Sequence, residues 1–456
     1  MKTRNIVRKR LFAIAVVLAT VLSVGAVRAQ DEWTLDRCIG HALENNIQIK
    51  QSALQQESAR LDKSQALAGM FPNLNASASY NANFGRSIDP VSNDFVSEQV
   101  NSNNYGIQSS VTLFNAFRLL NSFKQSQIDL LAAEYDLQGL SNDISMNIAT
   151  AFMQIMFNEE LLMVVQEQMD VTAEQLERTR KLVDSGSLPA GNLYDVQAQL
   201  ASNELQVVNA ENALSASILL LKQILNLQAS EGFKIKRPDT EVPLGSLEGR
   251  TVGTIYDQAL SNWPQIKARE ARLESARKGE KIAFATYTPS LSGSGSVFTR
   301  WSDATFLGIP ADPYGTQLDQ NLSESIGLSL SIPLFNGLRS RTSVAKSRLS
   351  TINAELQLQD QKNQLYSSVQ QAYNDASAAK RQFDASDKSV KAMEKAFEYA
   401  EQRYQVGMMN SLEFNTASNN LARARSELLR AKFDYIFKMK VLDFYQGKPI
   451  TFDQTE

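Results

Sequence analysis

The chain has 456 residues, of which 43% are hydrophobic and 21% are charged, and its formal net charge is −3. This ordinary hydrophobic content excludes a protein built mainly from membrane-spanning helices, and the acidic balance argues against general nucleic-acid binding. A single cysteine and a single histidine exclude an internal disulfide and a histidine-rich metal site within one chain.

The N-terminus has the composition of an export signal. Five basic residues lie within the first ten positions, an apolar run covers 11–27, and small residues lead to Ala29. We expect a signal peptide over 1–29, whose removal leaves 40 basic against 49 acidic residues, a net charge of −9. An uncleaved membrane anchor stays open because Arg28 lies in the cleavage region. Cys38 is too distant for lipid attachment, and no further helical membrane span is expected.

The rest of the chain contains an internal tandem duplication. The two copies share four features in the same order, at offsets between 217 and 221. Ala42–Lys50 recurs as Ala259–Lys267, Phe71–Leu74 as Thr288–Leu291, Leu113-Phe114-Asn115 as Leu334-Phe335-Asn336, and Gly186 as Gly407. Such a tandem repeat predicts one architecture built from two halves. We place the first repeat at 30–228, a linker at 229–250, the second repeat at 251–446 and a C-terminal tail at 447–456.

Each copy is expected to begin with a helix, at about 31–70 in the first, and to continue with a pair of strands. After Pro72, apolar and uncharged polar residues alternate strictly over 73–84, and the same alternation marks 326–334. Weaker alternation at 105–114 and 290–301 predicts the other two strands, with polar loops at 85–104 and 302–321.

Two kinds of sheet produce this alternation. Half-buried strands of a soluble sheet are one, and strands of a transmembrane barrel are the other. Uncharged polar faces, strand lengths near ten residues and aromatic residues at the strand ends favour the barrel. The aromatic residues form two expected rims: Phe71, Phe114, Tyr287 and Phe335 at one, and Tyr80, Phe84, Tyr105, Phe298 and Trp301 towards the other.

Long helices follow the strand pairs. Apolar residues recur every seven positions from Ile148 to Val183 and from Val369 to Tyr404, which is the seam of a coiled coil. A helix over 116–183 would be about 100 Å long. Breaks at 184–191 and 407–411 precede shorter return helices with the same spacing.

We find no catalytic constellation, so neither an enzyme nor a cofactor is expected. Cys38 and His41 are at helical spacing, but two residues of one helix near the mature N-terminus explain this better than a nucleophile pair. Asp195 and Glu413, just after the two breaks, have two interpretations. Acids are favoured at helix N-termini; alternatively, chains assembled around an axis would form acidic rings that favour cations at a constriction.

The duplicated order of helix, strand pair, long helix, tip and return helix resembles the TolC-type outer-membrane efflux and secretion channels. The resemblance covers about 31–447 and also uses Leu113-Phe114-Asn115, Leu334–Gly337, Arg403–Gly407 and Ser411–Glu413. It implies an α+β membrane protein: a long α-helical coiled-coil barrel joined to a transmembrane antiparallel β-barrel, with four strands per chain and internal duplication.

The resemblance further implies a homotrimer in the cell outer membrane, with its helical part in the periplasm. Its partners would be outer-membrane lipid, a periplasmic adaptor (membrane fusion) protein and an inner-membrane RND or ABC pump, and no nucleic acid. The acidic gate positions of the family correspond to Asp195 and Glu413. A second acidic position of the family is occupied by Thr416 here, and the position at which family members place a basic residue in the second tip falls near Met409. The adaptor-contacting tips would comprise Gly186, Leu188, Gly407, Met408 and Met409.

The sequence thus favours an outer-membrane exit duct of a tripartite efflux or type I secretion system, passing small molecules or exported protein. A periplasmic adaptor is the alternative, disfavoured because it lacks strand pairs with lipid-like faces. A structural coiled-coil stalk without a channel would not need the strands at all.

Overall fold

The computed structural model describes residues 32–88, 93, 95–96, 99–227, 233–237, 246–304 and 311–450. The expected signal peptide at 1–29 and parts of the expected linker and tail lie outside these residues. The chain divides into two compact units, and both units take segments from both halves of the sequence. Unit 1 draws on Met1–Ile47, Asp143–Arg250 and Gln371–Glu456, and unit 2 on Gln48–Asn142 and Thr251–Gln370. The repeat boundaries themselves stay a prediction.

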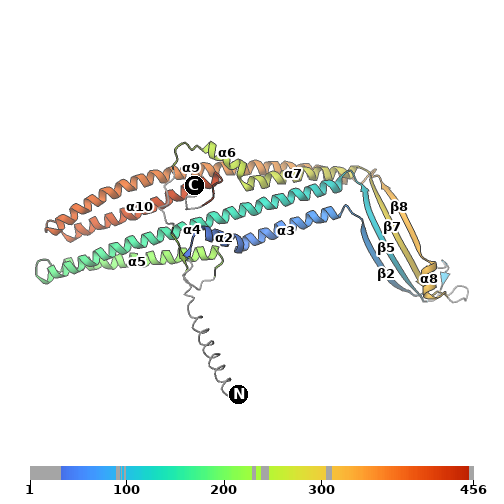
Figure 1. Ribbon diagram of the computed structural model, residues 1–456, viewed down its shortest axis with the longest axis horizontal. Coiled ribbons are helices and arrows are strands. Elements are labelled where there is room, and N and C mark those ends of the chain that lie inside the picture. Colours follow the sequence, from blue (N-terminus) through green and yellow to red (C-terminus); the bar gives the residue numbers. More distant parts are fainter. Residues whose placement is uncertain are drawn as a thin grey trace, which may run out of the picture. The chain divides into compact units, whose positions relative to one another are not determined.

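Unit 2 contains an antiparallel sheet of four strands, in the order β2-β5-β7-β8 (Figure 1). The strands are β2 (Asn73–Asn83), β5 (Val100–Phe114), β7 (Ser290–Ser302) and β8 (Ser323–Ser331). All four match predicted strands, although β5 begins five residues earlier and β8 ends three residues earlier than the alternation indicated. Because β5 and β7 come from different halves of the chain, their pairing joins the two repeats in one sheet.

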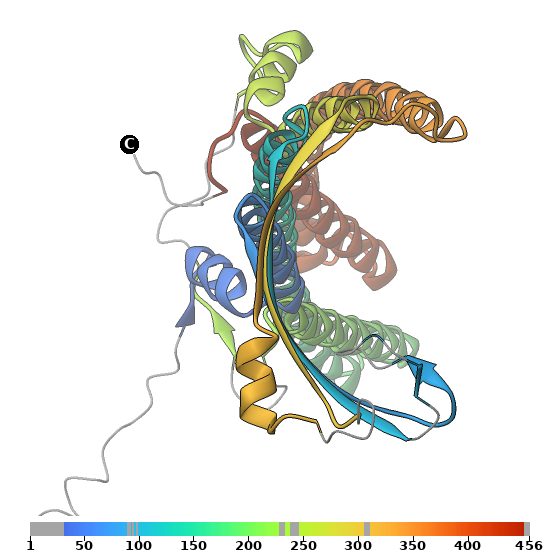
Figure 2. The same ribbon diagram turned by 90° about the vertical axis from the view of Figure 1, so that its right-hand side faces the viewer.

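The register gives this sheet one apolar face and one polar face. On the apolar face Leu74 lies opposite Ser109, and Leu291 opposite Leu330; on the polar face Asn75 lies opposite Gln108. The apolar side chains are uncovered: Ile326 is 95% exposed and Leu328 72%. Figure 2 shows that the sheet is curved, with helix α8 (Tyr314–Gln320) against its convex side.

Helix α8 identifies the convex side as the apolar one. The Tyr314 hydroxyl lies 2.7 Å from the Tyr105 hydroxyl, and the Tyr314 ring lies 5.3 Å from that of Trp301. Tyr105 and Trp301 occupy the same face of the register as Ala78 and Tyr80. The expectation of a plain polar loop at 302–321 is therefore wrong for 314–320, because a helix packs there on aromatic residues.

Glycines explain why two strands alternate only weakly in sequence. Side chains of Leu113, Leu328 and Val111 lie 3.6–3.7 Å from the position that a Cβ of Gly293 would take. A Cβ at Gly106 would lie 2.5 Å from the ring of Phe298. Large cross-strand neighbours thus cover the glycines. Phe298 lies on the polar face, so its assignment to an aromatic rim beside Trp301 is corrected.

The duplicated Leu-Phe-Asn motif forms the turn from strand to long helix in both halves. The side-chain oxygen of Asn115 accepts the backbone N–H of Leu119, and that of Asn336 accepts the N–H of Ser340, each at 3.4 Å. Left-handed φ angles follow both asparagines, 50° at Ala116 and 63° at Gly337. The asparagines therefore satisfy free N–H groups at the first turn of α4 (Arg118–Asp184) and α9 (Arg339–Gln405).

The first predicted helix is interrupted in both repeats. In place of one helix over 31–70, the structure has α2 (Leu35–Asn45) and α3 (Ile47–Ala68), and the second repeat has α6 (Val252–Asn262) and α7 (Pro264–Phe284). Asn46 and Trp263 are extended, with ψ of 131° and 116°, and their N–H groups bond Ala42 and Ala259 at 2.8 Å. The side chain of Asn46 also donates to the Ile224 carbonyl, which holds the break in place.

Unit 1 contains two helical hairpins. One pairs α4 from Asp143 onward with α5 (Gly191–Ile224), and the other pairs α9 from Gln371 onward with α10 (Ser411–Tyr445) (Figure 1). The predicted seven-residue spacing marks their cores: Ile148, Ile155 and Leu442 are fully buried. One window of α4, with mean hydropathy 1.4, is long and apolar enough to span a membrane by length and composition alone. No further helical membrane span is expected from the sequence. Because 44% of this window is buried, we attribute its apolar residues to the coiled-coil core.

A small parallel sheet pairs β1 (Glu32–Trp33) with β6 (Lys234–Ile235), so part of the predicted linker is structured. Trp33 packs edge-on to His41 and beneath the guanidinium of Arg37. Cys38 is fully buried, and burial raises the pKa of its thiol to about 12. A thiol protonated at neutral pH is a poor nucleophile, so Cys38 has a packing role.

Candidate functional site

The tips of the two hairpins turn by the same backbone motif. At the first tip the N–H of Ser187 bonds the Leu182 carbonyl at 2.8 Å, and at the second the N–H of Met408 bonds the Arg403 carbonyl at 2.8 Å. Gly186 and Gly407 follow the helix ends with φ of 74° and 76°. These are Schellman motifs. No atom lies within 4 Å of a Cβ built on either glycine, so the left-handed backbone, and not a steric clash, requires glycine there.

The two predicted gate acids have different local settings. Glu413 lies in the first turn of α10, whose N-cap Asn410 accepts the Glu413 N–H at 2.8 Å and donates to its carboxylate at 3.1 Å. Asp195 is the fifth residue of α5, so its predicted first-turn position is wrong. Both carboxylates are exposed. Thr416, at the second acid position of the family, donates its hydroxyl to the Leu412 carbonyl.

Apolar side chains surround the tips. Met408 is 73% exposed, whereas Leu188 and Met409 are half-buried, so Met408 is the most exposed apolar side chain of the predicted tip set. Three further apolar or aromatic residues near the tips are exposed and were not predicted from the sequence: Tyr194, Val406 and Leu412. Their positions in the sequence could have indicated this exposure, because each lies within five residues of a break and outside the main seven-residue spacing.

Neutral polar contacts join the two hairpins near their tips. The Ser411 hydroxyl donates to Asn192 at 3.1 Å, Gln199 and Asn419 exchange two amide hydrogen bonds at 3.0–3.1 Å, and Gln168 donates to Ser418 at 2.7 Å. A cavity of about 370 Å³ beside these residues is lined by α4, α5 and α10. The interface therefore combines amide hydrogen bonds with incomplete packing, in contrast to the apolar core around Ile148.

Arg403 and Tyr404 support the second tip from inside. Arg403 donates to the Met408 carbonyl at 3.3 Å, and the Tyr404 ring stacks on Phe414 at 4.6 Å. The Tyr404 hydroxyl, the amide nitrogen of Gln175 and the Thr179 hydroxyl are buried and have no hydrogen-bond partner among the described residues. A buried polar group without a partner costs stability, so these three groups do not strengthen the packing near this tip.

The polar face of the sheet is the second candidate surface. Across its described strands it carries Ser, Asn, Gln, Thr and Gly, together with Val100 and Phe298, and its only charged residue is Arg300. On the apolar face Glu324, next to the start of β8, is the only charged residue. A sheet with a hydrophilic, almost uncharged face can line water, while its opposite face can contact lipid.

No chemical site emerges from the described residues. They contain no group of three His, Cys, Asp or Glu side chains that could hold a metal ion. The features that stand out among the described residues are the two faces of the sheet and the paired tips.

Comparisons with known proteins agree with this arrangement. The family model described as "Outer membrane efflux protein" matches residues 38–227 and 255–438. The chain is 24% identical to the outer membrane protein TolC of Vibrio cholerae, over 74% of this chain and 72% of that protein. It is 22% identical to the proteases secretion protein PrtF of Dickeya chrysanthemi, over 71% and 68% respectively.

Solved structures share the fold. The outer membrane protein VceC of Vibrio cholerae superimposes with a TM-score of 0.75 at 18% identity, covering 91% of this chain and 96% of that one. The CmeC outer membrane channel of Campylobacter jejuni gives 0.71 at 21% identity, covering 92% and 87%. The periplasmic adaptor and the structural stalk, the alternatives considered from sequence, do not account for these matches. The chain belongs to the outer membrane efflux protein family and is an exit duct of the cell outer membrane.

Proposed function

We propose that three copies of the chain close a twelve-stranded transmembrane β-barrel and a helical barrel that extends into the periplasm. The observation that carries this proposal is the curved sheet, whose convex face is apolar and uncovered and whose concave face is polar. Unpaired strand edges are not viable in lipid, so β2 of one copy would pair with β8 of the next.

The strands limit the number of copies, and the family resemblance selects among the numbers that remain. One chain supplies four strands to the sheet. Bacterial barrels start at eight strands, so one chain is too few, while two would reach eight and three would reach twelve. The resemblance to TolC-type channels favours three. The domain order proposed here is a signal peptide at 1–29, the two repeats at 30–228 and 251–446, the linker at 229–250 and the tail at 447–456.

The proposed duct completes a tripartite export system. A periplasmic adaptor would bind the hairpin tips and connect them to an inner-membrane RND or ABC pump. The cargo would be small molecules or exported protein; the name of PrtF refers to secreted proteases, whereas CusC and OprN are described as channels. The duct itself would catalyse no reaction.

The assembly is tested by mass and conductance. Detergent-purified protein should have the mass of a trimer and should form ion-conducting pores in a planar bilayer. A folded monomer, or a trimer without conductance, would exclude the proposed duct.

Substitutions on opposite faces of β8 should have opposite effects. Leu328→Arg places a charge on the face assigned to lipid and should destabilise the inserted barrel by about 2–4 kcal/mol near the midplane. Ser329→Arg, one residue away on the water-filled face, is the matched control and should insert normally. The measurement is the folded fraction in lipid vesicles across a urea series; equal loss for both variants would refute the assignment of faces.

The acids near the tips should set ion preference. In a trimer Asp195 and Glu413 each occur three times, and clustered carboxylates attract cations. The double variant Asp195→Asn with Glu413→Gln should lower cation selectivity in the reversal potential and weaken block by multivalent cations.

The control for this experiment is Glu204→Gln with Glu211→Gln, which neutralises two exposed acids farther along α5. Because Asn410 holds the Glu413 carboxylate, glutamine at 413 keeps a hydrogen-bonding partner for the cap. If the gate variant and the control have the same selectivity, these acids act only as helix residues.

Adaptor docking should depend on the exposed apolar tip. Met408→Glu introduces a charge at a 73% exposed apolar side chain and should abolish export while leaving trimer mass and conductance unchanged. Met393→Glu, on helix α9 before this tip and 37% exposed, is the control. Full export through the Met408 variant would mean that the adaptor binds elsewhere.

A further inference from the structure

Basic residues gather where the sheet of unit 2 meets its helices. The segments 116–128, 277–288 and 336–350 contain nine basic residues and one acidic residue, Glu280. Arg277 and Lys278 pair with Glu355 and Glu274 at 3.7 and 3.8 Å. The other seven are exposed and have no carboxylate within ion-pair distance among the described residues: Arg118, Lys124, Lys281, Arg339, Arg341, Lys346 and Arg348. We call these seven residues the basic belt.

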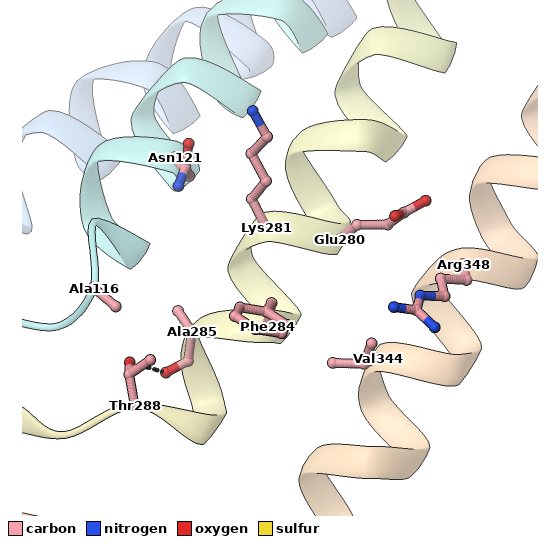
Figure 3. A pocket seen from close by; sticks show the side chains of 9 residues that line it. All are labelled: Ala116, Asn121, Glu280, Lys281, Phe284, Ala285, Thr288, Val344 and Arg348. Carbon is pink, nitrogen blue, oxygen red and sulfur yellow. Dashed lines mark hydrogen bonds between the residues drawn. The ribbon is translucent and has the colours of Figure 1, made fainter.

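A cavity of about 440 Å³ lies within the belt, bounded by α4, α7 and α9. Figure 3 shows that Lys281 points from α7 toward α4, near Asn121, while Glu280 and Arg348 face each other between α7 and α9. Glu280 and Arg348 do not reach ion-pair distance. Phe284, Ala285 and Val344 supply an apolar wall, and the Phe284 ring is 58% exposed. The cavity thus offers cationic donors beside an apolar surface.

Exposed aromatic side chains share this end of the sheet. Phe284 contacts Tyr287, and Phe114 contacts Phe117, each with ring centroids about 6 Å apart. Phe335, after β8, is 85% exposed. Aromatic residues of this kind gather at the level of lipid headgroups. The long helices leave the sheet at this end, so in the proposed duct this boundary faces the periplasm.

We propose that the cavity binds the headgroup of an anionic phospholipid from the periplasmic leaflet of the outer membrane. This inference rests on the orientation given by the proposed function. Lys281 and Asn121 donate to the headgroup phosphate, and Arg348 supplies the second positive charge. Phe284 and Val344 contact the glycerol and the first acyl carbons. The remaining belt residues attract further anionic headgroups around the duct.

The charge balance selects the class of lipid. A zwitterionic headgroup would bring its own cation against Lys281 and Arg348, whereas an anionic headgroup meets only Glu280 as an opposing charge. The exposed Phe284 ring disfavours free phosphate as the preferred ligand, since phosphate alone would leave that ring in water.

The test measures lipid binding to the detergent-purified trimer by native mass spectrometry and titration calorimetry. Short-chain phosphatidylglycerol is the probe, and phosphatidylcholine with the same chains and inorganic phosphate are the comparators. We expect phosphatidylglycerol to bind in preference to both. Lys281→Gln with Arg348→Gln should weaken its binding at least about tenfold, and Glu280→Gln should strengthen it about threefold.

The matched control is Arg381→Gln with Lys388→Gln, two exposed basic residues farther along α9, which should leave binding unchanged. Equal binding of phosphatidylcholine, equal binding of inorganic phosphate, or equal loss in the control would overturn the proposal. Because Glu280→Gln is expected to increase affinity, misfolding cannot imitate its result. Pore conductance reports on the duct separately, so intact pores without lipid preference would contradict this inference alone.

Discussion

The peptide groups along the outer edges of β2 and β8 have no neighbouring strand within the described sheet. In water such edges can bond solvent, but in lipid each unpaired group costs several kcal/mol. A sheet with a bare apolar face and two open edges therefore suits lipid only if other strands pair with those edges. The pairing of β5 with β7 shows how edge pairing is solved within the chain, since it joins one repeat to the other. In the proposed duct, pairing of β2 with β8 of the next copy would repeat this arrangement between chains.

Charge is distributed according to the surroundings that each part requires. The described strands carry one charged residue on each face, Arg300 on the polar face and Glu324 on the apolar face. So low a charge suits the proposed duct, in which the apolar face contacts lipid. Basic residues collect at the boundary between strands and helices, and exposed acids lie near the tips. The tips also replace apolar packing by amide pairs such as Gln199 with Asn419, which can separate at lower cost than a leucine seam.

The sequence predicted those features that depend on neighbours along the chain. The alternation of apolar and polar residues predicted the end of β2 to within one residue, and glycine indicated both hairpin tips. Both were predictable because the period of a strand and a left-handed backbone are set by residues close together in the chain. Contacts between residues far apart in the chain could not be predicted from the sequence. The break at Asn46 depends on the carbonyl of Ile224, α8 depends on Tyr105, and the face of Phe298 depends on covering Gly106. At the candidate site, the positions of the acids were predictable, but the cap that holds Glu413 and the exposure of Leu412 were not.

Helices α4 and α9 both contain 67 residues. Deleting one residue from either would shift everything beyond it by about 1.5 Å and rotate it by about 100°. The apolar row of that helix would then no longer face its partner helix, and Asn192 would no longer hydrogen-bond Ser411 at the tips. Only the loss or gain of whole heptads, made in both long helices and in their return helices, preserves every contact. Natural variation in the length of the helical hairpins should therefore occur in steps of seven residues, made together in the long and the return helices. The loops can change length without this restriction.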